Sequence, residues 1–370
     1  MILKNATVYG EDFFPGVTDI TIENGIITSL DKTENPGTDC TGKAIIPGFI
    51  DIHIHGCNMA DATDGKPDSV LEMSRFLPKC GVTSFCPTTM TISTEGLRKS
   101  FSFAAAAMGR EEGAYIHGIN MEGPFISPAK KGAQAQEHIK APDIELFKEL
   151  NSVCPVKLVD IAPEEKGSEE FIKEIKNICV VSAAHTCCDY AKAKESFGWG
   201  ISHATHLFNA MSGLGSREPG LVGAVFDSDN INAELICDGI HIHPATLRSA
   251  FAILGKNRTV VISDSTMASG LADGEYTLGG QKVFKKGAVR LEDGTLAGSA
   301  TNLFEEFRNL IDFGIPLEQA LRSVTINPAR AIGADKITGS LAVGKNADML
   351  IMSEDLRHIF NVFIKGKSII

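Results

Sequence analysis

The chain has 370 residues, 43% of them hydrophobic, which is enough to bury one large α/β core or two ordinary domains. The 46 Asp and Glu exceed the 35 Lys and Arg, and the net charge of −11 disfavours nucleic acid or an anionic membrane as a partner. No apolar run reaches the roughly 18–20 residues of a membrane helix, and the first residues lack the features of a signal peptide. Nine Cys without zinc-finger spacing predict reduced thiols in a cytoplasmic protein.

Short alternating segments at the two ends of the chain predict β-strands. They are residues 2–9, 18–23, 26–30, 347–352 and 360–365. Strands at the termini have few local partners, so we expect the two ends to pair with each other. Residues 1–45 and 336–370 are therefore predicted to form one small β-sandwich domain.

Between the ends, short apolar runs alternate with amphipathic stretches, which predicts an α/β domain over residues 46–335. The predicted strands are residues 46–55, 82–87, 114–121, 156–162, 179–185, 200–206, 232–238 and 259–264. The predicted helices are residues 68–79, 95–108, 143–151, 168–177, 244–254 and 301–313. Eight βα alternations favour a (β/α)8 TIM-type barrel. A doubly wound open sheet is the alternative, but no Gly-rich phosphate loop supports it. Residues 275–298 predict an inserted β-hairpin.

Side chains that bind metals follow five of the predicted strands. His53 and His55 lie two apart on the first strand and are expected to project together. The third, fifth, sixth and eighth strands end at Glu122, His185, His206 and Asp264. Because the C-terminal ends of barrel strands form one face, these six side chains predict a metal site there. Imidazole and carboxylate donors suit zinc, iron, manganese or cobalt, with zinc as our first expectation.

Each of these residues alone also has a simpler interpretation. A lone strand-end histidine is more often a hydrogen-bonded core residue than a ligand. Glu122 would serve equally to bind loop amides, and Asp264 to cap the segment that follows it. The coincidence at five strand ends favours one shared site. His203 is left out of it, because it has the wrong parity to share the face of His206.

Several longer motifs extend this pattern in chain order. They are PGFIDIHIHG, HGINMEGPFISPAKKGA, THLFNAM, SREPGLVGA, ICDGIHIHP, VISDSTMASG and GTLAGSA. Together they resemble the amidohydrolase superfamily and, within it, the N-acetylglucosamine-6-phosphate deacetylases. The resemblance runs from residue 47 to beyond residue 330. It implies a metal-dependent enzyme that removes the acetyl group from a phosphorylated amino sugar.

The resemblance also implies a role for each matching residue. Glu122, His185 and His206 would hold the hydrolytic metal, and His53 and His55 would add a second ion in the members that keep this pair. Asp264 would act as the catalytic acid/base. The sugar would contact Ala133, Asn209, Ala210, Leu296, Ala297 and Gly298.

The phosphate group of the substrate is expected to meet His241 and Arg217. In relatives this arginine comes from the neighbouring subunit, so the resemblance implies a homodimer. Both residues also have simpler interpretations, Arg217 as a surface charge and His241 as a helix cap. One departure is visible, because Gln134 stands where some relatives have a histidine. Any help of that histidine in orienting the acetamide is in doubt here.

Other functions remain open from the sequence. The C4 epimer, N-acetylgalactosamine 6-phosphate, is an alternative substrate that the motifs do not distinguish. Another amidohydrolase, such as a dihydroorotase or a nucleobase deaminase, is less favoured, because the dihydroorotase type usually needs a carboxylated lysine where Glu122 stands. A non-enzymatic relative would have lost the ligands, and all six are present here.

Overall fold

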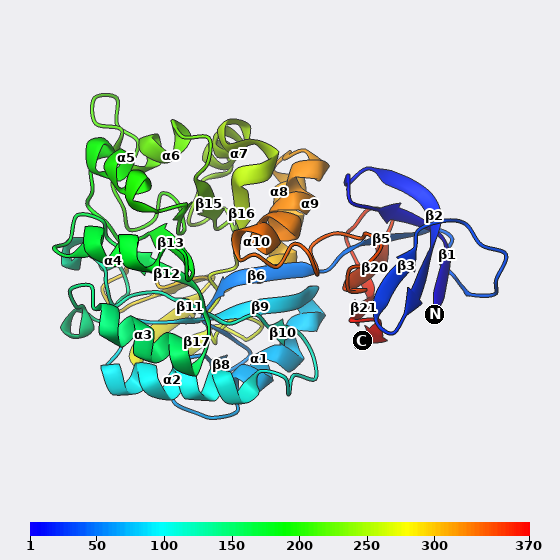
Figure 1. The fold of residues 1–370 in the computed structure, drawn as a ribbon, viewed down its shortest axis with the longest axis horizontal. Helices are drawn as coiled ribbons and strands as arrows, with labels where there is room; N and C mark the ends of the chain where they lie inside the picture. Colours follow the sequence, from blue (N-terminus) through cyan, green and yellow to red (C-terminus); the bar gives the residue numbers. More distant parts are fainter.

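The computed structural model describes residues 1–370 and consists of a parallel barrel wrapped in helices with a smaller β-sheet beside it (Figure 1). The barrel strands follow the chain as β6 (Phe49–Ile54), β9 (Val82–Thr89), β11 (Ile119–Met121), β12 (Val156–Ile161), β13 (Val180–Ala183), β14 (His203–Ala204), β15 (Asn232–Leu235) and β16 (Thr259–Val261). Each pairs in parallel with the next, and β10 (Tyr115–Ile116) adds a short first part to the third strand. The predicted barrel fold is confirmed.

The barrel closes through the segment that follows β16. The Asp264 amide donates to the His53 carbonyl at 3.0 Å, and the His55 amide donates to the Ser265 carbonyl at 2.9 Å. The first and last strand ends are therefore joined directly at the site of the predicted ligands.

The helices pack outside the barrel (Figure 1). Their buried apolar side chains share one hydrophobic core with those of the strands. The helices are α1 (Ser69–Phe76), α2 (Thr94–Ala107), α3 (Ile144–Val153), α4 (Ser168–Ile175), α5 (Tyr190–Trp199), α6 (Gly220–Phe226), α7 (Pro244–Arg258), α8 (Leu303–Asp312), α9 (Leu317–Val324) and α10 (Ile326–Ala331). All six predicted helices are present, with ends that differ by a few residues. None of the helices combines the length and apolarity needed to cross a lipid bilayer.

The two chain ends meet in a single sheet, as Figure 1 shows at the right of the barrel. Its strands are β1 (Ile2–Tyr9), β2 (Pro15–Glu23), β3 (Ile26–Ser29), β4 (Thr38–Asp39), β5 (Lys43–Pro47), β20 (Met349–Ser353), β21 (Ile359–Ile364) and β22 (Lys367–Ser368). Buried Leu3 and Ile27 from one end share a core with Met349 and Phe363 from the other. We propose that this sheet, predicted as residues 1–45 with 336–370, is a domain separate from the barrel.

The predicted strand 46–55 is wrong as a single element. It divides at Gly48, where the chain leaves β5 in the terminal sheet and enters β6 in the barrel. A Cβ atom at Gly48 would lie 2.2 Å from a side-chain carbon of Thr83, so only glycine allows this close crossing.

An inserted antiparallel sheet follows the last barrel strand. It contains β17 (Gly274–Leu278), β18 (Gln281–Lys286) and β19 (Ala288–Arg290), so the predicted hairpin has a third strand. Gln281 donates to the Ala133 carbonyl at 2.6 Å, which fastens this insertion to the loop after β11. A two-stranded ribbon of β7 (Gly56–Cys57) and β8 (Ala60–Asp61) lies near the first strand end.

Candidate metal centre and substrate cavity

The six predicted ligands lie together and are buried. They form two groups, in each of which the candidate ligand atoms lie within 4.8 Å of one another. The first group is His53, His55 and Asp264, and the second is Glu122, His185 and His206. We call them the Asp264 group and the Glu122 group. None of the nine cysteines belongs to either group or forms a disulfide.

The Glu122 group is compact. The Nε2 atoms of His185 and His206 each lie 3.1 Å from the same carboxylate oxygen, Oε1 of Glu122, and 3.2 Å from each other. Three donors therefore converge on one small space. Burial makes such close polar atoms costly unless a shared partner holds them together.

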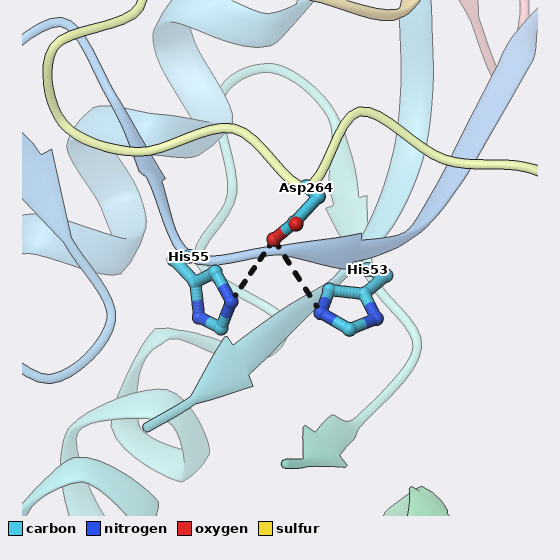
Figure 2. A group of neighbouring side chains, drawn as sticks. All are labelled: His53, His55 and Asp264. Atoms are coloured by element: carbon cyan, nitrogen blue, oxygen red, sulfur yellow. Dashed lines mark ion pairs between the residues drawn. The ribbon is translucent and has the colours of Figure 1, made fainter. Parts of the chain in front are cut away.

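The Asp264 group is looser. Figure 2 shows both imidazoles of the first strand turned toward the carboxylate. Oδ1 of Asp264 lies 3.2 Å from Nε2 of His55 and 3.7 Å from Nε2 of His53. The other oxygen of Glu122 lies 3.2 Å from Nε2 of His55, so Glu122 faces both groups.

Three of the four histidines present Nε2 to the centre because their Nδ1 atom is occupied, whereas Nδ1 of His206 has no hydrogen-bond partner. Nδ1 of His53 lies 3.0 Å from Glu234, Nδ1 of His55 lies 3.3 Å from the Thr88 carbonyl, and Nδ1 of His185 lies 2.8 Å from the Lys130 carbonyl. An Nδ1–H donated to such an oxygen leaves the Nε2 lone pair free for a metal.

The residues fit a divalent metal. Nε2 of His53 is buried without any hydrogen-bond partner, although it points toward two carboxylates. Four imidazole nitrogens and two carboxylates are the donors that zinc and related ions prefer. A cation between them would satisfy the orphaned nitrogen and balance the buried negative charge.

The close approach of these buried imidazoles and carboxylates shifts their pKa values. Burial opposes the charged form of His55, but hydrogen bonds to Asp264 and Glu122 outweigh it and raise its pKa to about 10. Burial would likewise raise the pKa of Glu122, yet hydrogen bonds from His185 and His206 lower it well below its ordinary value. Without a metal, protons on the imidazoles therefore supply the positive charge in this centre, and a metal ion must displace them in order to bind.

Three of the ligands sit on strained backbone. His185, His206 and Asp264 follow their strands with φ of 44°, 31° and 46°, in the left-handed region that residues with a Cβ atom rarely adopt. Such strain clusters where a site must hold a side chain in place. Because the chain leaves the extended conformation here, strand parity does not predict where these side chains point.

A cavity of about 340 Å³ opens above both groups. His55, Glu122, His185, His206 and Asp264 line its floor. The predicted substrate residues that line it are Ala133, Asn209, Ala210, His241, Leu296 and Gly298. Ala297 is buried and does not line it, and Arg217 lies in an exposed bend that also does not reach it.

Two of the lining residues are held in defined positions. Nδ1 of His241 lies 2.7 Å from the Asp238 carboxylate, which orients the ring, while His243 rather than His241 caps α7. Gly298 has φ of 63°, and a Cβ atom there would lie 2.9 Å from the Asp264 carbonyl. Glycine therefore allows the 296–298 segment to pass close to Asp264.

Gln134 lies in the cavity wall and is almost fully buried. Its amide nitrogen lies 2.7 Å from Oε2 of Glu122, and its amide oxygen accepts from the Thr91 backbone at 2.7 Å. The side chain is thus engaged on both sides and orients Glu122. In this structure it is a partner of the ligand Glu122.

Two functional candidates were missed in the sequence. Glu234 and His203 are fully buried inside the barrel, and Nε2 of His203 lies 3.2 Å from Oε1 of Glu234. Excluding His203 by parity overlooked that it meets the centre through Glu234. The available signal was the single charge of Glu234 within the apolar strand NAELIC.

Comparisons with known proteins agree over nearly the whole chain. A sequence profile of the amidohydrolase family matches residues 44–369. The N-acetylglucosamine-6-phosphate deacetylase of Bacillus subtilis (strain 168) is 39% identical over 327 residues, which cover 86% of this chain and 83% of that protein. The N-acetylgalactosamine-6-phosphate deacetylase of Escherichia coli O157:H7 is 32% identical over 352 residues, which cover 94% of this chain and 93% of that protein.

Solved structures show the same architecture. A mutant N-acetyl-D-glucosamine-6-phosphate deacetylase from Mycobacterium smegmatis, in complex with N-acetyl-D-glucosamine-6-phosphate, matches with a TM-score of 0.93 at 27% identity. The match covers 100% of this chain and 99% of that chain. The chain therefore belongs to the amidohydrolase family, in the group that includes the N-acetylglucosamine-6-phosphate deacetylases.

Proposed function

We propose that this protein hydrolyses the N-acetyl group of N-acetyl-D-glucosamine 6-phosphate to give D-glucosamine 6-phosphate and acetate. The observation that carries the proposal is the meeting of two buried ligand groups at the floor of a cavity of about 340 Å³. Relatives of this name that are similar over most of the chain support the choice of substrate.

The Glu122 group would hold the hydrolytic ion, and His53 and His55 a second one. A divalent ion bound there supplies Lewis-acid polarisation of the acetyl carbonyl and makes a water molecule more acidic. The chain's own contribution is to fix the ligands, through the Nδ1 contacts of His53, His55 and His185. It also excludes bulk solvent from the buried floor.

Asp264 would move the proton. Burial raises its pKa, but the hydrogen bond from His55 and the charge of His53 lower it overall, so the group is a carboxylate near neutral pH. It accepts a proton from the attacking water as the new carbon–oxygen bond forms. It then delivers that proton to the amide nitrogen as the carbon–nitrogen bond breaks, which releases a neutral amine.

The remote end of the substrate would be held away from the bond that is cut. His241, oriented by Asp238, faces the cavity and would contact the phosphate. Arg217 is exposed and outside the cavity, which suits delivery to the active site of a neighbouring subunit in a homodimer. Binding energy from the phosphate would position the acetamide over the metal site.

The 32% identity to a deacetylase of the C4 epimer makes N-acetylgalactosamine 6-phosphate the second candidate substrate. The test is to reconstitute purified protein with zinc, iron, manganese or cobalt and to measure acetate released from both sugar phosphates. We expect acetate from N-acetylglucosamine 6-phosphate with a higher kcat/KM, and loss of activity after chelation. A higher kcat/KM for the galactosamine epimer would reassign the substrate, and no acetate from either would overturn the proposal.

A further inference from the structure

One fully buried carboxylate, that of Glu234, contacts members of both ligand groups. Glu234 projects from β15 into the barrel, with no part of its side chain exposed to solvent. No Lys or Arg pairs with it, so its partners are histidines and backbone amides. A buried charge without such partners would be strongly destabilising.

The contacts of Glu234 reach each group by a different route. Its Oε2 lies 3.0 Å from Nδ1 of His53, a member of the Asp264 group. The same oxygen lies 3.3 Å from the backbone nitrogen of His206, a member of the Glu122 group. Its Oε1 lies 3.2 Å from Nε2 of His203, which belongs to neither group.

We propose that Glu234 is a positioning residue that fixes His53 as a metal ligand and joins the two ligand groups, an inference that rests on the proposed function. By accepting from Nδ1, it requires the other nitrogen of His53 to carry the lone pair. That nitrogen is the buried Nε2 without a hydrogen-bond partner. A negative partner on Nδ1 also makes the imidazole a stronger donor to a cation.

The hold on His206 acts through the backbone. His206 lies at φ of 31°, so its main chain needs support to stay in place. The Glu234 side chain accepts weakly from the His206 amide, and the Glu234 carbonyl accepts from the Leu207 amide at 2.8 Å. One residue thus braces the turn that carries a ligand of the second group.

His203 holds the far side of Glu234. His203 contacts Oε1 of the Glu234 carboxylate, while the other oxygen, Oε2, contacts His53. His203 is therefore expected to act on metal binding only through Glu234, and more weakly.

The chain offers a matched control in Glu306. This residue is also fully buried, yet neither of its carboxylate oxygens has a hydrogen-bond partner and it contacts no ligand. Glu306→Gln makes the same substitution as Glu234→Gln at equal burial, but burial raises the pKa of Glu306 well above its ordinary value, so it replaces a protonated carboxyl group rather than a charge. It separates a general effect on the barrel from an effect on the metal centre.

The test measures zinc affinity of the full chain by competition with a chromogenic chelator, without using the deacetylase reaction. His53→Asn is expected to remove one of the two bound ions. Glu234→Gln is expected to lower the affinity for that same ion by about 10–100-fold, the usual effect of losing such a partner. Glu306→Gln should leave affinity unchanged. At the ion that His53 holds, combining Glu234→Gln with His53→Asn should add little, because there both changes act through His53.

Unchanged zinc affinity in Glu234→Gln, or fully additive losses in the double variant, would overturn the proposal. If Glu234→Gln does not fold, His203→Gln decides, with a smaller loss supporting the role and no loss overturning it. Wild-type protein that binds zinc but releases no acetate would overturn the proposed function alone.

Discussion

The two ligand groups face the same cavity but differ in how closely their atoms approach. In the Glu122 group both imidazole nitrogens lie 3.1 Å from one carboxylate oxygen. In the Asp264 group the corresponding distances are 3.2 and 3.7 Å, and the nitrogen of His53 that faces the centre, Nε2, has no hydrogen-bond partner. We infer a division of labour between two buried carboxylates. Glu122 holds a cation, and Asp264 keeps enough freedom to exchange a proton with the substrate.

The largest expected effect comes from removing that proton exchange. Asp264→Asn should lower kcat by about 10²–10⁴-fold, because the amide cannot accept and return the proton. The Glu122 group should keep its ion, since none of its members is changed. Steady-state kinetics with metal analysis of the same sample would check this, and near-normal turnover would contradict the role of Asp264.

Substitution of one histidine in each group compares the two directly. His206→Asn should abolish both zinc retention in the Glu122 group and deacetylation. His53→Asn should weaken only the second ion and leave measurable activity, because the tighter group remains complete. The reverse order, with His53→Asn inactive and His206→Asn active, would exchange the roles of the groups.

Arg217→Ala tests the part of the site outside the cavity. We expect KM for N-acetylglucosamine 6-phosphate to rise about tenfold or more, with little change for the unphosphorylated sugar, because the arginine would contact only the phosphate. Kinetics on both sugars provide the measurement and its control. Equal effects on the two would argue against a phosphate contact.

The smallest expected effect is on stability. The pKa of His55 is raised to about 10 in the folded, metal-free protein by its carboxylate partners, against burial, so its protonation stabilises the fold below its ordinary pKa. That contribution is lost as pH rises from about 6.5 to 10. Chelated protein should therefore lose a few degrees of Tm across this window.

Metal-loaded protein lacks this proton and should lose less. Thermal unfolding of both forms at several pH values gives the comparison, with chelated His55→Asn as the control expected to show a flatter profile. A chelated protein as insensitive to pH as the loaded one would contradict the account of the proton in the Asp264 group.

Much of the fold could be predicted from periodicity. The eight apolar runs lie on the barrel strands, and helices such as α8 have a clear apolar stripe of Leu303, Phe307 and Leu310. The helices α5, α6, α9 and α10 were not predicted, and in α6 the segment GLVGAVF is apolar all round and carries no period. The break at Gly48 was missed because it depends on Thr83, which lies on another strand.

The ligands that lie at strand ends could be predicted from the sequence, but the residues that hold those ligands in place could not. Glu122, His185 and Asp264 each follow an apolar run, so the barrel rule brought them together. Glu234 and His53 are 181 residues apart, and their contact follows no local pattern. The positive φ at His206 likewise depends on tertiary packing. His203, which was excluded by parity, belongs to neither ligand group and reaches the centre only through Glu234.

Anomalous diffraction from crystals of zinc-loaded protein, recorded on both sides of the zinc absorption edge, tests the central claim most directly. A peak is expected about 2.0–2.2 Å from the Glu122 carboxylate and from Nε2 of both His185 and His206. No peak in that space, in protein that still releases acetate from the sugar phosphate, would contradict the account.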